Sequence, residues 1–96
     1  MSYQLEALEI LRDAKPILIS KFPIKKLAVF GSVSRQVDKE NSDIDILVEF
    51  ERSVGMEFIH LCYELERLLN RKVDLVSRNG IKQKYFNEIE QELIYV

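Results

Sequence analysis

The sequence predicts an α/β (α+β) fold in which a small mixed sheet carries helices packed mainly on one face. Three segments show apolar residues at helical spacing, and three short apolar runs between them have the length of strands. This interleaving is typical of helices layered on a sheet. In chain order we predict a helix, two strands, a helix, a strand and a helix, at residues 3–22, 25–30, 43–50, 56–70, 73–77 and 81–92.

The first helical segment contains a proline. Pro16 either kinks one helix or opens a second short helix, and we expect the second arrangement because Pro is favoured in a first helical turn. Phe22 and Pro23 then end the helix ahead of the first strand.

The two central strands are joined by about eleven residues, too few for a helical crossover, so we expect them to be antiparallel. Residues 33–36 are predicted to form a short helix and residues 38–42 a surface loop. At the other end of the chain, Asn79-Gly80 is predicted to form a turn. Residues 93–96 either add a strand or cover the core.

Residues 43–50 alternate in polarity. Side chains of successive strand residues point to opposite faces, so Ile44, Ile46, Val48 and Phe50 belong to the core face, while Asp43, Asp45, Leu47 and Glu49 share the other. Two strand rises place Asp43 and Asp45 about 6.7 Å apart, close enough for both carboxylates to converge on a cation. Carboxylate oxygens are ligands that Mg²⁺ prefers. The simpler interpretation is a solvated strand start.

Asp74 is a third candidate acid, because it interrupts the apolar run at residues 73–77 and Asp is depleted from strands. It either joins Asp43 and Asp45 from a neighbouring strand or pairs with Arg71 or Lys72 at the sheet edge.

A glycine turn follows the first strand. Gly31 allows a sharp turn close to a ligand, and Ser32 offers a hydroxyl and an N–H to a phosphate. The turn is neither a Walker loop nor a dinucleotide fingerprint. Arg35 either contacts a triphosphate oxygen or braces the loop against Glu49.

Gly31-Ser32, ten intervening residues, and Asp43-x-Asp45 on a strand resemble the active-site signature of the nucleotidyltransferase superfamily, which includes DNA polymerase beta and kanamycin nucleotidyltransferase. The likeness extends over nearly the whole chain. It identifies residues 1–96 as one minimal nucleotidyltransferase-like domain of the MNT (MntA-like) antitoxin branch, whose members are encoded beside HEPN toxins. Gln36 departs from the Gly usual in long family members.

The resemblance implies a mechanism and a partner. Two Mg²⁺ ions would be held by Asp43, Asp45 and Asp74, and Asp74 would help to deprotonate the attacking hydroxyl. Gly31, Ser32 and Arg35 would bind the nucleotide. AMP would pass from ATP to an acceptor hydroxyl, specifically a Tyr of a HEPN toxin. The alternative is a non-catalytic nucleotide-binding antitoxin that acts by contact. An antibiotic-modifying enzyme is disfavoured because 96 residues leave little room for a second substrate domain.

The composition limits the classes of binding partner and the cellular compartment that we expect. A net charge of −2 disfavours a long nucleic-acid template. One Cys fits a reducing compartment, and neither a signal peptide nor an apolar membrane-spanning stretch is evident, so we expect a cytoplasmic protein. The sequence is compatible with a homo-oligomer as well as with a monomer.

Overall fold

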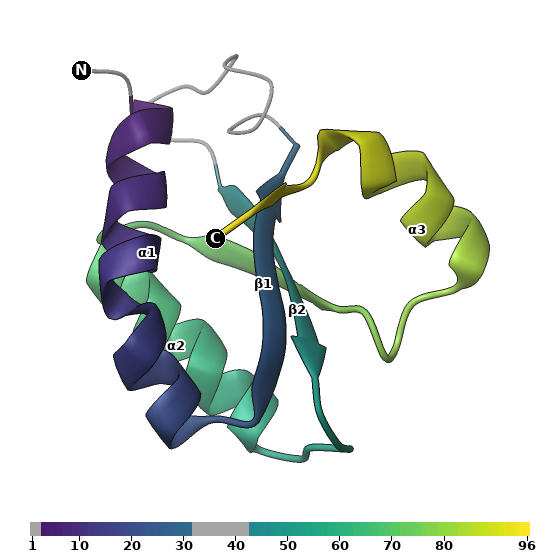
Figure 1. Ribbon diagram of the computed structural model, residues 1–96, viewed down its shortest axis with the longest axis horizontal. Helices are drawn as coiled ribbons and strands as arrows, with labels where there is room; N and C mark the ends of the chain where they lie inside the picture. The colour runs from purple at the N-terminus through teal and green to yellow at the C-terminus, as the bar shows by residue number, and fades with distance from the viewer. Residues whose placement is uncertain (1–2, 32–42) are drawn as a thin grey trace.

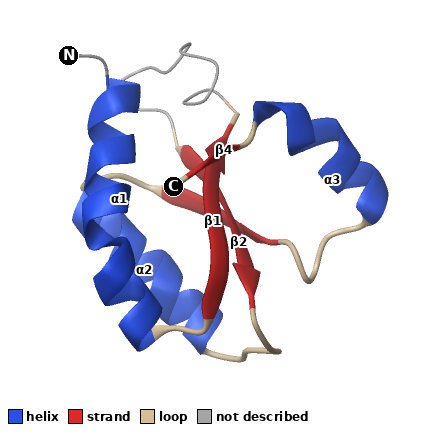
Figure 2. Cartoon of the chain, in the orientation of Figure 1, coloured by secondary structure: helices blue, strands red, loops and turns tan. Residues whose placement is uncertain are grey.

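The computed structural model describes residues 3–31 and 43–96, so the elements predicted at residues 33–36 and 38–42 lie outside the described residues. A four-stranded sheet lies between helices (Figures 1 and 2). In the described ranges, no helix has the length and apolar character needed to cross a membrane. The elements are α1 (Tyr3–Lys21), β1 (Ile24–Phe30), β2 (Ile44–Phe50), α2 (Glu57–Leu69), β3 (Val73–Ser77), α3 (Gln83–Ile89), a 3₁₀ turn (Glu90–Glu92) and β4 (Ile94–Tyr95).

The sheet is mixed, with strand order β3-β2-β1-β4. The predicted antiparallel pairing of β1 with β2 is confirmed. β2 and β3 are parallel, and α2 provides the crossover that a parallel pair requires. Of the two alternatives for the last residues, the structure has the strand, because β4 pairs antiparallel with β1. The α/β prediction is therefore correct.

Helices α1 and α2 cover one face of the sheet and form the main core with it (Figure 1). Leu61, Leu65 and Leu69 follow one another at four-residue spacing along α2, which places all three on one side of the helix. The core face predicted for residues 44–50 is confirmed, because these alternate residues are buried against the helices: Ile44, Ile46, Val48 and Phe50.

Helix α3 lies against the opposite face of the sheet (Figure 2). Its Ile89 packs with Phe30 of β1 and Leu47 of β2 in a second, smaller cluster. Leu47 lies on the same face as Asp45, so α3 partly covers the face of the sheet that carries the acids.

The prediction that Pro16 opens a second helix is wrong. α1 runs without interruption from Tyr3 to Lys21 with Pro16 inside it. Leu11 and Leu18, on either side of the proline, are both buried in the main core, so packing against the sheet holds the two halves in one helix. Burial of these residues outweighs the backbone hydrogen bond that Pro cannot donate.

Pro16→Ala is expected to stabilise the protein. Pro16 is exposed, and Ala restores the missing N–H, so the free energy of unfolding should rise by about 1–3 kcal/mol. Urea unfolding followed by circular dichroism measures the change. Glu9→Ala, an exposed site on the same helix, is the control and should change stability by less than about 0.5 kcal/mol. A less stable Pro16→Ala protein would show that Pro16 makes a contact worth more than the lost hydrogen bond.

Candidate active site

Two of the predicted acids are brought side by side by strand pairing. Asp45 on β2 and Asp74 on β3 are direct partners in the parallel register. Neighbouring strands lie about 4.8 Å apart and their paired side chains point the same way, so the two carboxyl groups meet above the sheet. The neighbouring Asp74 carboxyl is one of the causes that raise the pKa of Asp45.

Asp43 stands next to this pair, exposed and just before the start of β2. Its charge acts on Asp45. Over residues 3–31 and 43–96, however, no three His, Cys, Asp or Glu side chains are gathered closely enough to hold one metal ion. The described arrangement is therefore a carboxylate pair with a third acid close by.

Gly31 forms one wall of the site. It ends β1 with a φ of +74°, in the left-handed region that side chains rarely adopt. A Cβ built on Gly31 would lie 2.2 Å from Oδ2 of Asp45, which is far inside van der Waals contact. Only glycine therefore leaves room for the Asp45 carboxylate in this position.

The environment raises the pKa of Asp45 to about 6. Burial is the largest cause, because it disfavours the charged carboxylate. The charge of Asp74, the hydrogen bond with Asp74, and the charges of Asp43 and Glu92 raise it further. A site that concentrates negative charge in this way favours a bound cation, and two carboxylates are a donor set that suits Mg²⁺ together with water and phosphate oxygens.

Helix α3 and the turn after it contribute groups that the sequence analysis missed. The charge of Glu92 raises the pKa of Asp45, and the pKa of the Tyr85 phenol is raised by burial and then by Asp74 and Asp45. A signal was present in the sequence, because the apolar Leu47 on the acid face required a covering element. Which element covers it depends on long-range packing.

Two predicted nucleotide ligands, Ser32 and Arg35, lie outside the described residues. Glu49, one of the two partners considered for Arg35, has its Oε2 3.7 Å from the Lys25 ammonium nitrogen. The roles of Ser32 and Arg35 stay predictions.

In a metal-free buffer, Asp45→Asn is expected to stabilise the protein above pH 6. The folded-state pKa of about 6 exceeds the ordinary Asp value of 3.8, so the folded protein loses stability as pH rises from about 4 to 6 and does not regain it at higher pH. Removing the charge should raise the free energy of unfolding at pH 7 by about 1–2 kcal/mol, a value reduced from the full shift because the group is partly exposed.

Urea unfolding between pH 4 and 8 in EDTA measures this effect, with Glu49→Gln on the same strand as the control. The advantage of Asp45→Asn should disappear toward pH 4. An advantage that is equal at every pH would mean that the substitution acts through packing rather than through charge.

Comparison with known proteins places the chain among related sequences. The model of the nucleotidyltransferase domain family matches residues 11–96. A protein of Methanocaldococcus jannaschii, provisionally named a protein adenylyltransferase, is 43% identical over 93 residues, covering 95% of both chains. The protein adenylyltransferase MntA of Thermococcus cleftensis is 40% identical over 94 residues, covering 96% of this chain and 95% of its own.

Solved structures show the same fold. One, described provisionally as a minimal nucleotidyltransferase, has a TM-score of 0.81 and 34% identity, covering 98% of this chain and 95% of its own. A tri-AMPylated HEPN toxin of Shewanella oneidensis in complex with its MNT antitoxin has a TM-score of 0.62, covering 99% of this chain and 71% of that one. At 21% identity, this second likeness concerns the fold alone.

Proposed function

Because this chain belongs to the family of nucleotidyltransferase domains, we propose that it moves AMP from ATP to an acceptor hydroxyl in a Mg²⁺-dependent reaction. We further propose that the acceptor is a Tyr of a HEPN-type toxin, that the modification neutralises this toxin, and that the pair acts in the cytoplasm. The alignment of Asp45 with Asp74 beside Gly31 is the observation that carries the proposal.

The acids fit the metal that the family implies. Asp45 and Asp74 supply paired carboxylates, and Asp43 adds a third nearby. Burial and then the negative charge of the neighbouring acids raise the pKa of Asp45, and a bound cation would offset that charge. These three residues would hold Mg²⁺. When bound, the metal would supply charge neutralisation at the phosphate oxygens.

The side chains would divide the remaining work. Asp74 is exposed and would accept the proton of the acceptor hydroxyl, whose oxygen then bonds to the α-phosphorus of ATP as the bond to the bridging oxygen breaks and pyrophosphate leaves. Gly31 would hold Asp45 in place and let the backbone approach the β- and γ-phosphates, with Ser32 and Arg35 as further phosphate ligands.

A protein acceptor suits the exposure of the site. Asp43 and Asp74 are both exposed, so a hydroxyl carried on another protein has access to the acids. Two relatives that match nearly the whole chain carry the name protein adenylyltransferase, one of them provisionally. The structural neighbour from Shewanella oneidensis pairs an MNT antitoxin with an AMPylated HEPN toxin.

A transfer assay tests the proposal. The chain is incubated with Mg²⁺, ATP radiolabelled at the α-phosphate, and the protein encoded by the neighbouring gene. We expect label on that protein, and no label with the Asp43→Asn, Asp45→Asn double variant. Absence of label from a partner that still binds this chain would reject transfer and favour neutralisation by contact.

A further inference from the structure

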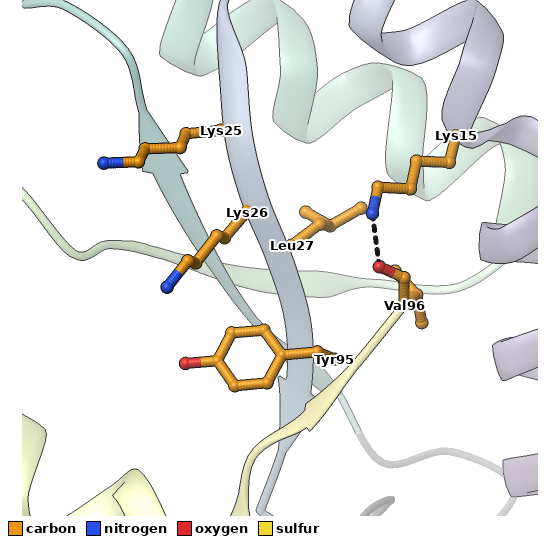
Figure 3. A pocket seen from close by; sticks show the side chains of 6 residues that line it. All are labelled: Lys15, Lys25, Lys26, Leu27, Tyr95 and Val96. Carbon is orange, nitrogen blue, oxygen red and sulfur yellow. Dashed lines mark hydrogen bonds between the residues drawn. The ribbon is translucent and has the colours of Figure 1, made fainter.

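A second polar site lies on the sheet away from the acids. A cavity of about 240 Å³ opens beside β1, near the contact with β4 (Figure 3). Three of its six lining residues are lysines. We call it the lysine edge, and it consists of Lys15, Lys25, Lys26, Leu27, Tyr95 and Val96.

Among the described residues, β4 leaves positions 24–26 of β1 without a strand partner on this side, although the Ile24 N–H donates to the Phe22 carbonyl at 2.8 Å. β4 pairs only with Ala28 and Val29, and the Val96 N–H donates to the Leu27 carbonyl at 3.0 Å. Along the described part of the chain, no strand pairs with residues 24–26 on this side of β1, since β4 is the last strand of the sheet. The edge can therefore accept one more strand in line with the end of β4.

An irregularity in β1 gathers positive charge beside this open edge. The register with β2 shifts between Ile24 and Lys26, which interrupts the usual alternation of side chains. Lys25 and Lys26, though consecutive, project to the same side as the Tyr95 ring (Figure 3). The Lys26 ammonium lies 5.9 Å from the centre of that ring.

The third lysine closes the other side of the cavity. Lys15 of α1 donates to the carbonyl oxygen of Val96 at 2.5 Å, which ties the end of β4 to the helix (Figure 3). Glu49 is the acid paired with this cluster, with its Oε2 3.7 Å from the Lys25 nitrogen. The lysine edge is thus a positive site on a chain whose net charge is −2.

We propose that the lysine edge docks an extended acidic segment of a partner protein as an added strand beside residues 24–26. Backbone hydrogen bonds would provide the pairing, and carboxylates at alternate positions of the segment would face Lys25 and Lys26. Lysines on a strand edge repel basic strands, so the same residues select for acidic ones. The proposal does not depend on the transfer reaction, since it concerns binding alone.

The experiment uses a short capped peptide of alternating Asp and Val, titrated into the full chain and followed through the backbone amide signals in NMR. We expect the shifts to be confined to residues 24–27 and to Tyr95 and Val96. A peptide of alternating Lys and Val should give none. Shifts located elsewhere, or equal shifts with both peptides, would overturn the proposal.

Charge variants make the test specific. Lys25→Glu with Lys26→Glu should weaken binding of the acidic peptide at least about tenfold, since two attractive charges become repulsive. Lys21→Glu with Arg67→Glu makes the same charge change at exposed sites outside the lysine edge and should leave binding within about twofold. If the reversed charges beside Glu49 impair folding, the neutral double variant Lys25→Gln, Lys26→Gln replaces the charge-reversal variant in the binding measurement.

Inorganic polyphosphate is the competing probe. If polyphosphate shifts the lysine-edge signals while the acidic peptide leaves them unchanged, the site recognises a phosphate chain and the proposal is wrong. Equal binding of the acidic peptide to the parent and to both lysine variants would also overturn it, because the charges would then play no part.

Discussion

Asp74→Asn is expected to lower kcat for AMP transfer by about 10²–10⁴-fold, the usual contribution of a positioned general base. Asn has the shape of Asp, but it cannot accept the proton of the attacking hydroxyl and lacks the negative charge with which Asp74 would help to hold Mg²⁺. Asp74 is exposed at the site while Asp45 is partly buried, so the fold should survive the change. Initial rates with the protein acceptor measure the loss, and equilibrium binding of ATP analogue should change far less.

Glu49→Gln is the matched control for Asp74→Asn. Glu49 lies on the same sheet face as Asp45, two rows away along β2, and its carboxylate is close to Lys25 rather than to the acid pair. This variant should keep nearly the full rate. If both variants lose the same activity, the effect comes from general charge on the face and not from Asp74.

Gly31→Ala is expected to damage both the site and the fold. The new Cβ would lie 2.2 Å from the Asp45 carboxylate, and the φ of +74° strains any residue with a side chain. The free energy of unfolding should fall by about 1–3 kcal/mol. Because Asp45 must move, the transfer rate should fall by on the order of 10²-fold in the protein that remains folded.

Gly55→Ala separates this effect from a general intolerance of glycine replacement. A Cβ at Gly55 has no neighbour within 4 Å, so stability and rate should both stay near the parent values. Thermal unfolding and transfer rates are measured together for the two variants. A Gly31→Ala protein with the parent's rate would show that Asp45 has room to move without loss of function.

Much of the local structure follows from side-chain pattern. The alternation between residues 44 and 50 placed the apolar set in the core and Asp45 on the opposite face, and the structure confirms both. Strand β3 lies at the predicted residues. Alternation predicts burial because successive side chains of a strand point to opposite faces of the sheet. One face packs against the core and the other does not, so the polarity of each residue indicates its face.

Pro16 shows where local rules fail. Its preference for a first helical turn argued for a new helix, yet the buried Leu11 and Leu18 hold one continuous α1. The predicted last helix was likewise too long, since α3 ends at Ile89 and gives way to a 3₁₀ turn. At Pro16, packing between distant segments outweighed the preference of a single residue.

For the acid site, too, some features follow from the sequence and others only from the tertiary structure. The sequence by itself determined which acids are candidates for the site, namely Asp43, Asp45 and Asp74, and that Gly31 follows the first strand. Only the tertiary structure decided that Asp45 and Asp74 pair directly across β2 and β3 and that α3 covers the sheet face on which they lie. Strand register and burial arise between residues far apart in the chain, and they set the pKa of Asp45 at about 6.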